Sequence, residues 1–175
     1  LLRNGNHVTL AIAESAAGAG DGGSVLIKEA LNDYYEQGIE KIIFADGTIW
    51  TRNEMRLILL DQVMTAGDDT INGFNVADII NAGAGNDTIN AGSGNDTITG
   101  GLGDDVINGS YGNDTYYYSR GDGNDTITEA TSSGNADQLI LVDINPADIT
   151  LLRNGNHVTL AIAESAAGAG DGGSV

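Results

Sequence analysis

The chain has 175 residues with 25 acidic and seven basic side chains, and its net charge of −18 argues against nucleic acid or an anionic membrane as a partner. It has no cysteine, which excludes disulfides and thiolate metal sites, and no apolar run reaches the ~18 residues of a membrane span. Hydrophobic residues make up 41% of the sequence and many recur at fixed spacing, which argues against a disordered acidic tail and leaves a salt-adapted surface or sites for hard cations.

Residues 1–64 are predicted to form a flanking β-rich segment that ends in a helix. Two short strands are expected within 39–50, around a turn at Asp46-Gly47. Within 53–63 apolar side chains recur at helical spacing, at Met55, Leu59 and Val63. This helix is expected to cap the open end of the following repeat structure, because the apolar core of a solenoid needs a cover.

Histidines and aromatic residues of the flanks are predicted to lie at the surface or to pack, and not to bind a ligand. They comprise His7, His157, Tyr34, Tyr35, Phe44 and Trp50.

Residues 65–128 carry a nine-residue repeat. Its aspartates are Asp69, Asp78, Asp87, Asp96, Asp105 and Asp114, and an apolar or aromatic residue follows each by two places. The clearest blocks read AGAGNDTIN, AGSGNDTIT and GGLGDDVIN. Glycines at fixed places predict tight turns, and the Thr-Ile-Asn or Val-Ile-Asn triplets predict short strands. Two nonapeptides then make one coil, so that residues 18 apart stack at a strand spacing of about 4.8 Å.

This stacking predicts two ladders of carboxylates, one on each edge of the coil. Adjacent carboxylates about 5 Å apart repel by roughly 1–4 kcal/mol per pair, so the ladders should keep a metal-free segment unfolded. Ca²⁺ accepts six to eight oxygens and tolerates carboxylates mixed with backbone carbonyls, whereas zinc prefers His or Cys, which this segment lacks. Residues 61–128 hold eleven aspartates and one basic residue, a net charge of −10 that five calcium ions would neutralise.

The sequence therefore predicts about four to five Ca²⁺ ions between stacked coils. The expected pairs are Asp69/Asp87, Asp87/Asp105, Asp78/Asp96 and Asp96/Asp114, with Asp105/Asp125 as a less regular fifth. The glycines expected in the metal-binding turns are Gly83, Gly85, Gly92, Gly94, Gly101, Gly103, Gly112 and Gly123. A site on the turn 73–78 is in doubt because that turn lacks two of the glycines. Two other interpretations of the repeat are a disordered Gly/Asp-rich linker and a metal-free solenoid.

Residues 129–175 are predicted to form a β-hairpin segment. Strands are expected at 139–142, 149–153 and 157–162, the last two joined by the turn signal Asn154-Gly155-Asn156. Residues 151–175 repeat residues 1–25 without a change. A repeating unit of 150 residues follows, so that 1–25 is the end of one unit's hairpin and 129–175 begins the next unit.

The nonapeptides fit the pattern G-G-x-G-x-D-x-U-x and resemble the RTX (repeats-in-toxin) proteins. The segment I-E-K-I-I-F-A-D-G-T-I-W and the paired strands N-P-A-D-I-T-L-L-R-N-G-N-H-V-T-L resemble a second family, the haemolysin-type calcium-binding-related domain. These resemblances imply an all-β fold, a parallel β-roll with flanking β-hairpins and one or two short capping helices. They also imply export from a bacterium by type I secretion, with calcium folding the roll outside the cell.

No acid/base pair, phosphate loop or catalytic triad stands out, so the chain is not expected to be an enzyme. The first hypothesis is a structural module of a large secreted or cell-surface tandem-repeat protein, such as an adhesin, surface layer or filament. Its expected partners are neighbouring identical units, by end-to-end association. The alternative is a calcium-dependent accessory region of an exported enzyme or toxin, and calcium-mediated carbohydrate binding is a third hypothesis.

Overall fold

The computed structural model describes residues 1–31, 38–130, 136–166 and 168–175, which form mostly β-structure with one α-helix. They divide into two compact units, Leu1–Gln62 and Val63–Val175. No helix in these residues is long and apolar enough to cross a membrane. Tyr34 and Tyr35 lie outside the described residues, and the predicted three-part division of the chain stays a prediction.

The first unit holds two small antiparallel sheets and the helix. One sheet has the order β1-β2-β3, and the other is the hairpin β4-β5 predicted around Asp46-Gly47, which is confirmed. The elements are β1 (Leu2–Asn4), β2 (His7–Ile12), β3 (Gly23–Ile27), β4 (Lys41–Ile43), β5 (Ile49–Thr51) and α1 (Arg52–Asp61).

The helix α1 begins at a capping box, in which Thr51 accepts from the backbone N–H of Glu54 and the Glu54 carboxylate accepts from that of Thr51. Its buried apolar residues are Met55, Leu59 and Leu60. The predicted end at Val63 was wrong, because α1 ends at Asp61 and Val63 lies beyond it, 40% exposed. The helix packs within the first unit, against β5, and its capping role stays a prediction.

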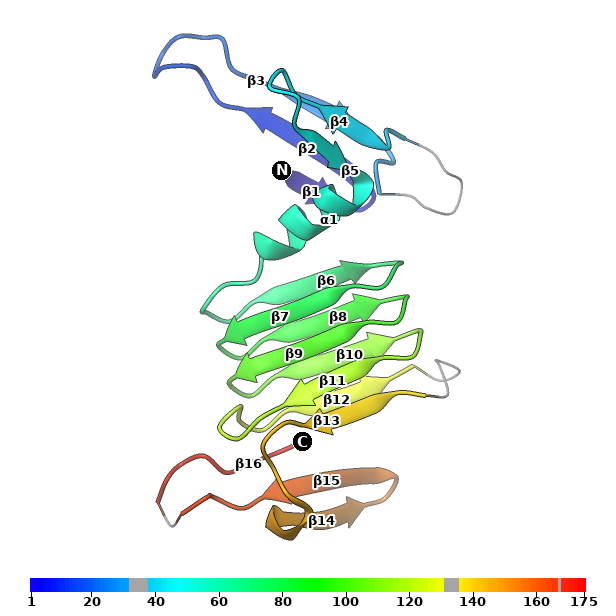
Figure 1. Cartoon of the computed structure of the whole chain (residues 1–175), viewed down its shortest axis with the longest axis vertical. Helices are drawn as coiled ribbons and strands as arrows, with labels where there is room; N and C mark the ends of the chain where they lie inside the picture. Colours follow the sequence, from blue (N-terminus) through cyan, green and yellow to red (C-terminus); the bar gives the residue numbers. More distant parts are fainter. Residues whose placement is uncertain (32–37, 131–135, 167) are drawn as a thin grey trace. The chain divides into compact units, whose positions relative to one another are not determined.

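The second unit is dominated by a parallel β-solenoid of about three turns, visible in Figure 1 as stacked strands from β6 to β13. Even-numbered strands form one parallel sheet and odd-numbered strands the other. The strands are β6 (Thr70–Phe74), β7 (Ile79–Ala84), β8 (Thr88–Gly92), β9 (Thr97–Leu102), β10 (Val106–Ser110), β11 (Thr115–Tyr118), β12 (Thr126–Glu129) and β13 (Gln138–Leu141).

The register confirms that two nonapeptides make one coil. Ile71 pairs with Ile89 and Ile89 with Ile107, each 18 residues apart. The side chain two places after each repeat aspartate points into the narrow core, where none is more than 3% exposed. These core residues are Ile71, Ile80, Ile89, Ile98, Ile107 and Tyr116.

Close backbone approach explains the glycines of the turns. Gly103 has a φ of +133°, and a Cβ there would lie far inside van der Waals contact with the Gly85 carbonyl one coil earlier. Ser110 occupies the position nine residues after Gly101, the other glycine position of these turns, and still adopts a φ of +75°. The stacked coils therefore impose this conformation on the turn.

Below the solenoid in Figure 1, the second unit ends in an antiparallel sheet of order β14-β15-β16. Its strands are β14 (Ile149–Asn154), β15 (His157–Ile162) and β16 (Gly173–Ser174), preceded by the short 3₁₀ helix η1 (Pro146–Asp148). The predicted hairpin is confirmed, and the strand expected at 139–142 begins and ends one residue earlier. Tyr118, Ile144 and Ile162 form a shared buried cluster, which joins this sheet to the last coil of the solenoid.

Candidate metal centre

The repeat aspartates stack in two ladders, one on each edge of the solenoid. In each ladder the backbone N–H of one aspartate donates to Oδ1 of the aspartate one coil later, as from Asp78 to Asp96 and from Asp96 to Asp114 (both 2.8 Å). All five predicted pairs are brought together in this way; the other three are Asp69/Asp87, Asp87/Asp105 and Asp105/Asp125. The 18-residue spacing of the sequence therefore accounts for four of these pairs, and a 20-residue step places Asp105 beside Asp125.

The second oxygen of the central aspartates has a different environment. Oδ2 of Asp87, Asp96, Asp105 and Asp114 is buried without a hydrogen-bond partner in the described structure, and these residues are at most 1% exposed. A buried carboxylate oxygen without a partner carries a large desolvation penalty. Four such oxygens at equivalent places indicate cation sites along the two edges of the solenoid.

Burial is the main cause of raised pKa values in both ladders. It raises the pKa of Asp96 to about 6, with neighbouring aspartates adding to the effect and the Asp78 N–H opposing it. It raises the pKa of Asp125 to about 7 in the same way. The pKa values of Asp87, Asp105 and Asp114 are also raised, above all by burial. Without a metal, burial therefore disfavours the ionised form of these aspartates.

The first coil differs, because its aspartates are satisfied by their own turns. Asp69 accepts from the backbone N–H (2.6 Å) and the hydroxyl (3.0 Å) of Thr65, and Asp78 accepts from the N–H of Phe74 (2.6 Å). The turn 73–78, in doubt from its missing glycines, still stacks, since Phe74 pairs with Gly92. As a ligand, Asp69 therefore has fewer free oxygens to offer than each of the central four.

All eight glycines predicted in the metal-binding turns lie in the left-handed region of φ, between +105° and +145°. Stacked coils bring such turns together at both edges, as the pairing of Gly83 with Gly101 illustrates. Their role as carbonyl ligands stays a prediction, as does the ligand role of each aspartate. A parallel outer ladder accompanies them: the N–H of Asn86 donates to Asp68, and that of Asp104 to Asn86 (both 2.8 Å).

The sequence analysis missed the last member of one ladder, Asp137. The N–H of Asp114 donates to Asp137 Oδ1 (3.0 Å), and Tyr116 pairs with Leu139. Within the described residues, Asp114, Glu129 and Asp137 each place one carboxylate oxygen within 4.8 Å of the others. The sequence did contain a signal, because Leu139 follows Asp137 by two places, but the 23-residue step from Asp114 breaks the nine-residue period.

The donor set fits calcium. Stacked carboxylates with unpartnered oxygens, in glycine turns and without His or Cys, are the hard oxygen ligands that Ca²⁺ prefers. The family model described as RTX calcium-binding nonapeptide repeat (4 copies) matches residues 65–89, 72–107 and 90–127. The solenoid is an RTX calcium-binding repeat module. A second model, the haemolysin-type calcium binding protein related domain, matches residues 18–54.

The RTX match includes the ladder aspartates from Asp69 to Asp125 and ends before Asp137. The second match includes the segment around Asp46 but does not extend to 145–160, which was expected to resemble the same family. No curated protein matches the chain. RTX repeats of this kind are structural, and no finding points to a catalytic activity.

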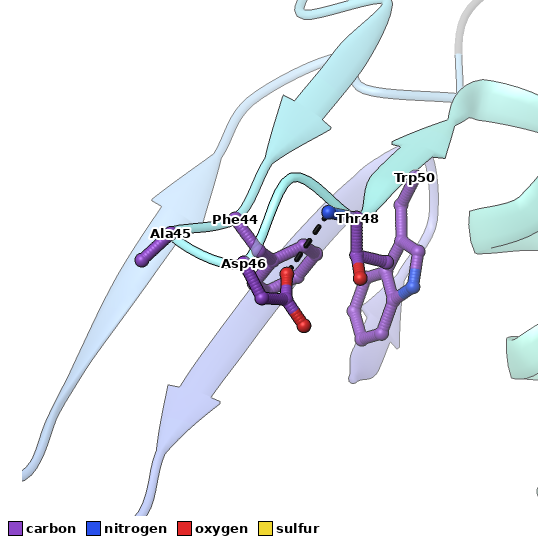
Figure 2. Close-up of a pocket in the computed structure, with 5 residues that line it drawn as sticks. All are labelled: Phe44, Ala45, Asp46, Thr48 and Trp50. Carbon is purple, nitrogen blue, oxygen red and sulfur yellow. Dashed lines mark hydrogen bonds between the residues drawn. The ribbon is translucent and has the colours of Figure 1, made fainter.

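Outside the RTX module, two of the predicted packing residues, Phe44 and Trp50, line a shallow hollow of the β4-β5 turn (Figure 2). The rings of Phe44 and Trp50 lie edge to face with centroids 4.6 Å apart, and Asp46 accepts from the N–H of Thr48 (2.9 Å). His7 is half-buried and accepts from the N–H of Glu29 (3.0 Å). Phe44, Trp50 and His7 therefore have partners within the described residues, and the prediction that these residues bind no ligand stays a prediction.

Acidification is expected to stabilise the metal-free RTX module. Burial raises the folded-state pKa of Asp96 from 3.8 to about 6 and that of Asp125 from 3.8 to about 7. Between the unfolded and the folded pKa values, the folded chain therefore binds more protons than the unfolded chain. The stabilisation is complete below the unfolded pKa and is lost as pH rises through about 6 to 7. Circular dichroism in chelator should show β-signal increasing from pH 8 to pH 5.

The same pH series in saturating calcium is the control. There the β-signal should not increase on acidification, because calcium binding needs ionised carboxylates. A metal-free chain whose β-signal falls between pH 8 and pH 5 would contradict the burial of these carboxylates.

Proposed function

We propose that the chain is a calcium-binding structural module of a large exported protein built from tandem copies of this unit, and that it folds when it meets calcium outside the cell. The observation that carries the proposal is the set of four buried, unpartnered aspartate oxygens at equivalent places in stacked coils. Such a set is unfavourable without a cation and favourable with one, so that metal binding and folding are coupled.

The tandem arrangement is supported by the sequence. Residues 1–25 and 151–175 are identical, which defines a 150-residue period that contains one complete RTX array. A uniform composite unit of this length suits an extended scaffold such as an adhesin, surface layer or filament. It favours that class over an accessory region attached to one catalytic or pore-forming domain.

Export is supported by the family and by the charge. RTX repeats are typical of exported bacterial proteins. Where calcium is scarce, the repelling carboxylates would keep the chain unfolded, the state in which a chain is threaded through a secretion channel. Where calcium is abundant, the ladders would bind it and the solenoid would form.

A calcium titration of the purified chain tests this proposal. Far-UV circular dichroism should show a cooperative rise in β-signal as CaCl₂ is added to chelated protein. MgCl₂ should give little change, because Mg²⁺ demands a tighter octahedral shell and gives up its waters reluctantly. A chain that is fully folded in chelator and indifferent to calcium would overturn the proposal and leave a metal-independent solenoid.

A further inference from the structure

The 25-residue repeat presents one sequence in two surroundings. Both copies fold into the same hairpin, with Leu2 paired to Thr9 in the first copy and Leu152 to Thr159 in the second. Both also form the same loop, in which a glutamate carboxylate accepts from two glycine N–H groups: Glu14 in the first copy, Glu164 in the second. The local structure is therefore fixed by the repeat itself, and differences in burial arise from neighbours.

The two copies differ at one end of the central strand. Ile162 is 6% exposed because it packs with Tyr118 and Ile144 at the end of the solenoid. Its equivalent in the first copy, Ile12, is 49% exposed. Burial of an isoleucine side chain is favourable, so the exposed Ile12 end of the first hairpin is an apolar surface that a partner can cover.

The opposite end of the same strand shows the reverse difference. Val8 is fully buried and pairs with Ile27 of β3, whereas its equivalent Val158 is 56% exposed. Val8 and Ile12 lie four residues apart and thus on the same face of the strand. One face of the hairpin therefore has two contact sites. The valine packs against the structure that follows the hairpin in sequence, and the isoleucine packs against the end of a solenoid.

Polar contacts also join the second copy of the hairpin to the end of the solenoid. Arg120, the one basic residue of 61–128, donates to the carbonyl of Ala163 and forms an ion pair with Asp148 (2.7 Å). The N–H of Gly121 donates to the Asp171 carbonyl (3.1 Å) and that of Asp125 to the Ser174 carbonyl (2.8 Å). The three acceptors recur in the first copy as Ala13, Asp21 and Ser24.

We propose that the Ile12 end of the first hairpin is a docking surface for the solenoid end of a second copy of this unit, placed before it in a tandem chain. This inference rests on the proposed tandem function. The second copy would seat Ile12 against its own equivalents of Tyr118 and Ile144, and its arginine would donate to Ala13. Each hairpin would then clamp two neighbouring units. The contact is head to tail, so the same contact would repeat from each copy to the next along the tandem chain.

Thiol protection tests the proposal, since the chain has no cysteine of its own. The chain is lengthened by one 150-residue period, and a single cysteine replaces isoleucine at the Ile12 position of the first, middle or last hairpin. In saturating calcium, the middle and last thiols should react at least about 10-fold more slowly than the first. At the Val8 position, the first and middle thiols should be protected and the last one reactive.

The matched variant is Ile12→Asp, which should lower the thermal midpoint in calcium when placed in the middle hairpin and leave it unchanged in the first. A middle thiol at the Ile12 position that reacts as fast as the first would overturn the docking surface. Circular dichroism of the same samples separates the two proposals, because a calcium-dependent β-signal with an unprotected middle thiol leaves the calcium module standing and removes only the docking.

Discussion

Replacing Asp96 with asparagine is expected to lower the apparent calcium affinity of the RTX module by at least about 10-fold, the smaller effect seen on losing even an outer-shell partner of a metal site. Asp96 stands in the middle of its ladder, between Asp78 and Asp114, so it faces both predicted sites on that edge. Asparagine keeps the acceptor for the Asp78 N–H but replaces the unpartnered, buried Oδ2 by a neutral amide.

Without metal, the same substitution should not reduce the stability of the folded chain. The pKa of Asp96 is raised to about 6 by burial, so at neutral pH the folded chain holds an unfavourable charge that asparagine removes. In chelator the variant should therefore be no less folded than the parent chain. Calcium titrations followed by circular dichroism measure both effects.

Asp61→Asn is the matched control, since Asp61 is exposed at the end of α1 and outside the ladders. Asp143, which also lies outside the repeat, is a poorer control because it accepts from the N–H of Arg120 (2.9 Å) in the closing turn. Equal losses of calcium affinity for Asp61→Asn and Asp96→Asn would mean that overall charge, and not the ladder, governs binding.

Replacing Gly103 with alanine is expected to destabilise the calcium-bound module by about 3 kcal/mol or more, the sum of the strain of a positive φ and of overpacking. The φ of Gly103 is +133°, and its Cβ would collide with the backbone carbonyl of Gly85. Neither atom can move without separating two coils. Thermal or urea unfolding in saturating calcium measures the loss.

Gly121→Ala separates the two contributions. Gly121 also has a positive φ, +85°, but a Cβ there would meet no atom within 4 Å. The free energy of unfolding of this variant should fall only by the cost of a positive φ at a non-glycine residue, about 1–2 kcal/mol. If both alanine variants were equally stable, close approach between coils would not be the reason for the glycine ladder.

The sequence alone determined the solenoid. Each nine-residue repeat has an aspartate and, two places later, an apolar residue. This short offset within one extended segment determines which side chain lies at the edge and which enters the core. Stacking at 18 residues then follows from the count of two nonapeptides per coil. Ile71 on Ile89 and Asp78 on Asp96 were predictable for this reason.

Regularity also limited what could be predicted. Asp137 follows Asp114 in the ladder after a step of 23 residues. Glu129, at the end of β12, places a carboxylate oxygen near those of Asp114 and Asp137. Neither could be placed by extending the period, since chain length between coils decides the register there. The end of α1 was misplaced because apolar spacing does not say which turn packs: Leu60 is buried and Val63 is not.

Only the tertiary structure decided which carboxylate oxygens lack a hydrogen-bond partner. It also decided which of two equivalent side chains in the 25-residue repeat is buried. The four buried Oδ2 atoms exist because the neighbouring coil occupies Oδ1 and excludes water, an arrangement of several coils and not of one repeat. Ile12 and Ile162 have identical local sequences and hairpins, yet one is exposed and the other is buried. Burial depends on what lies beside a strand, whereas the sequence of the strand determines only the face on which each side chain lies.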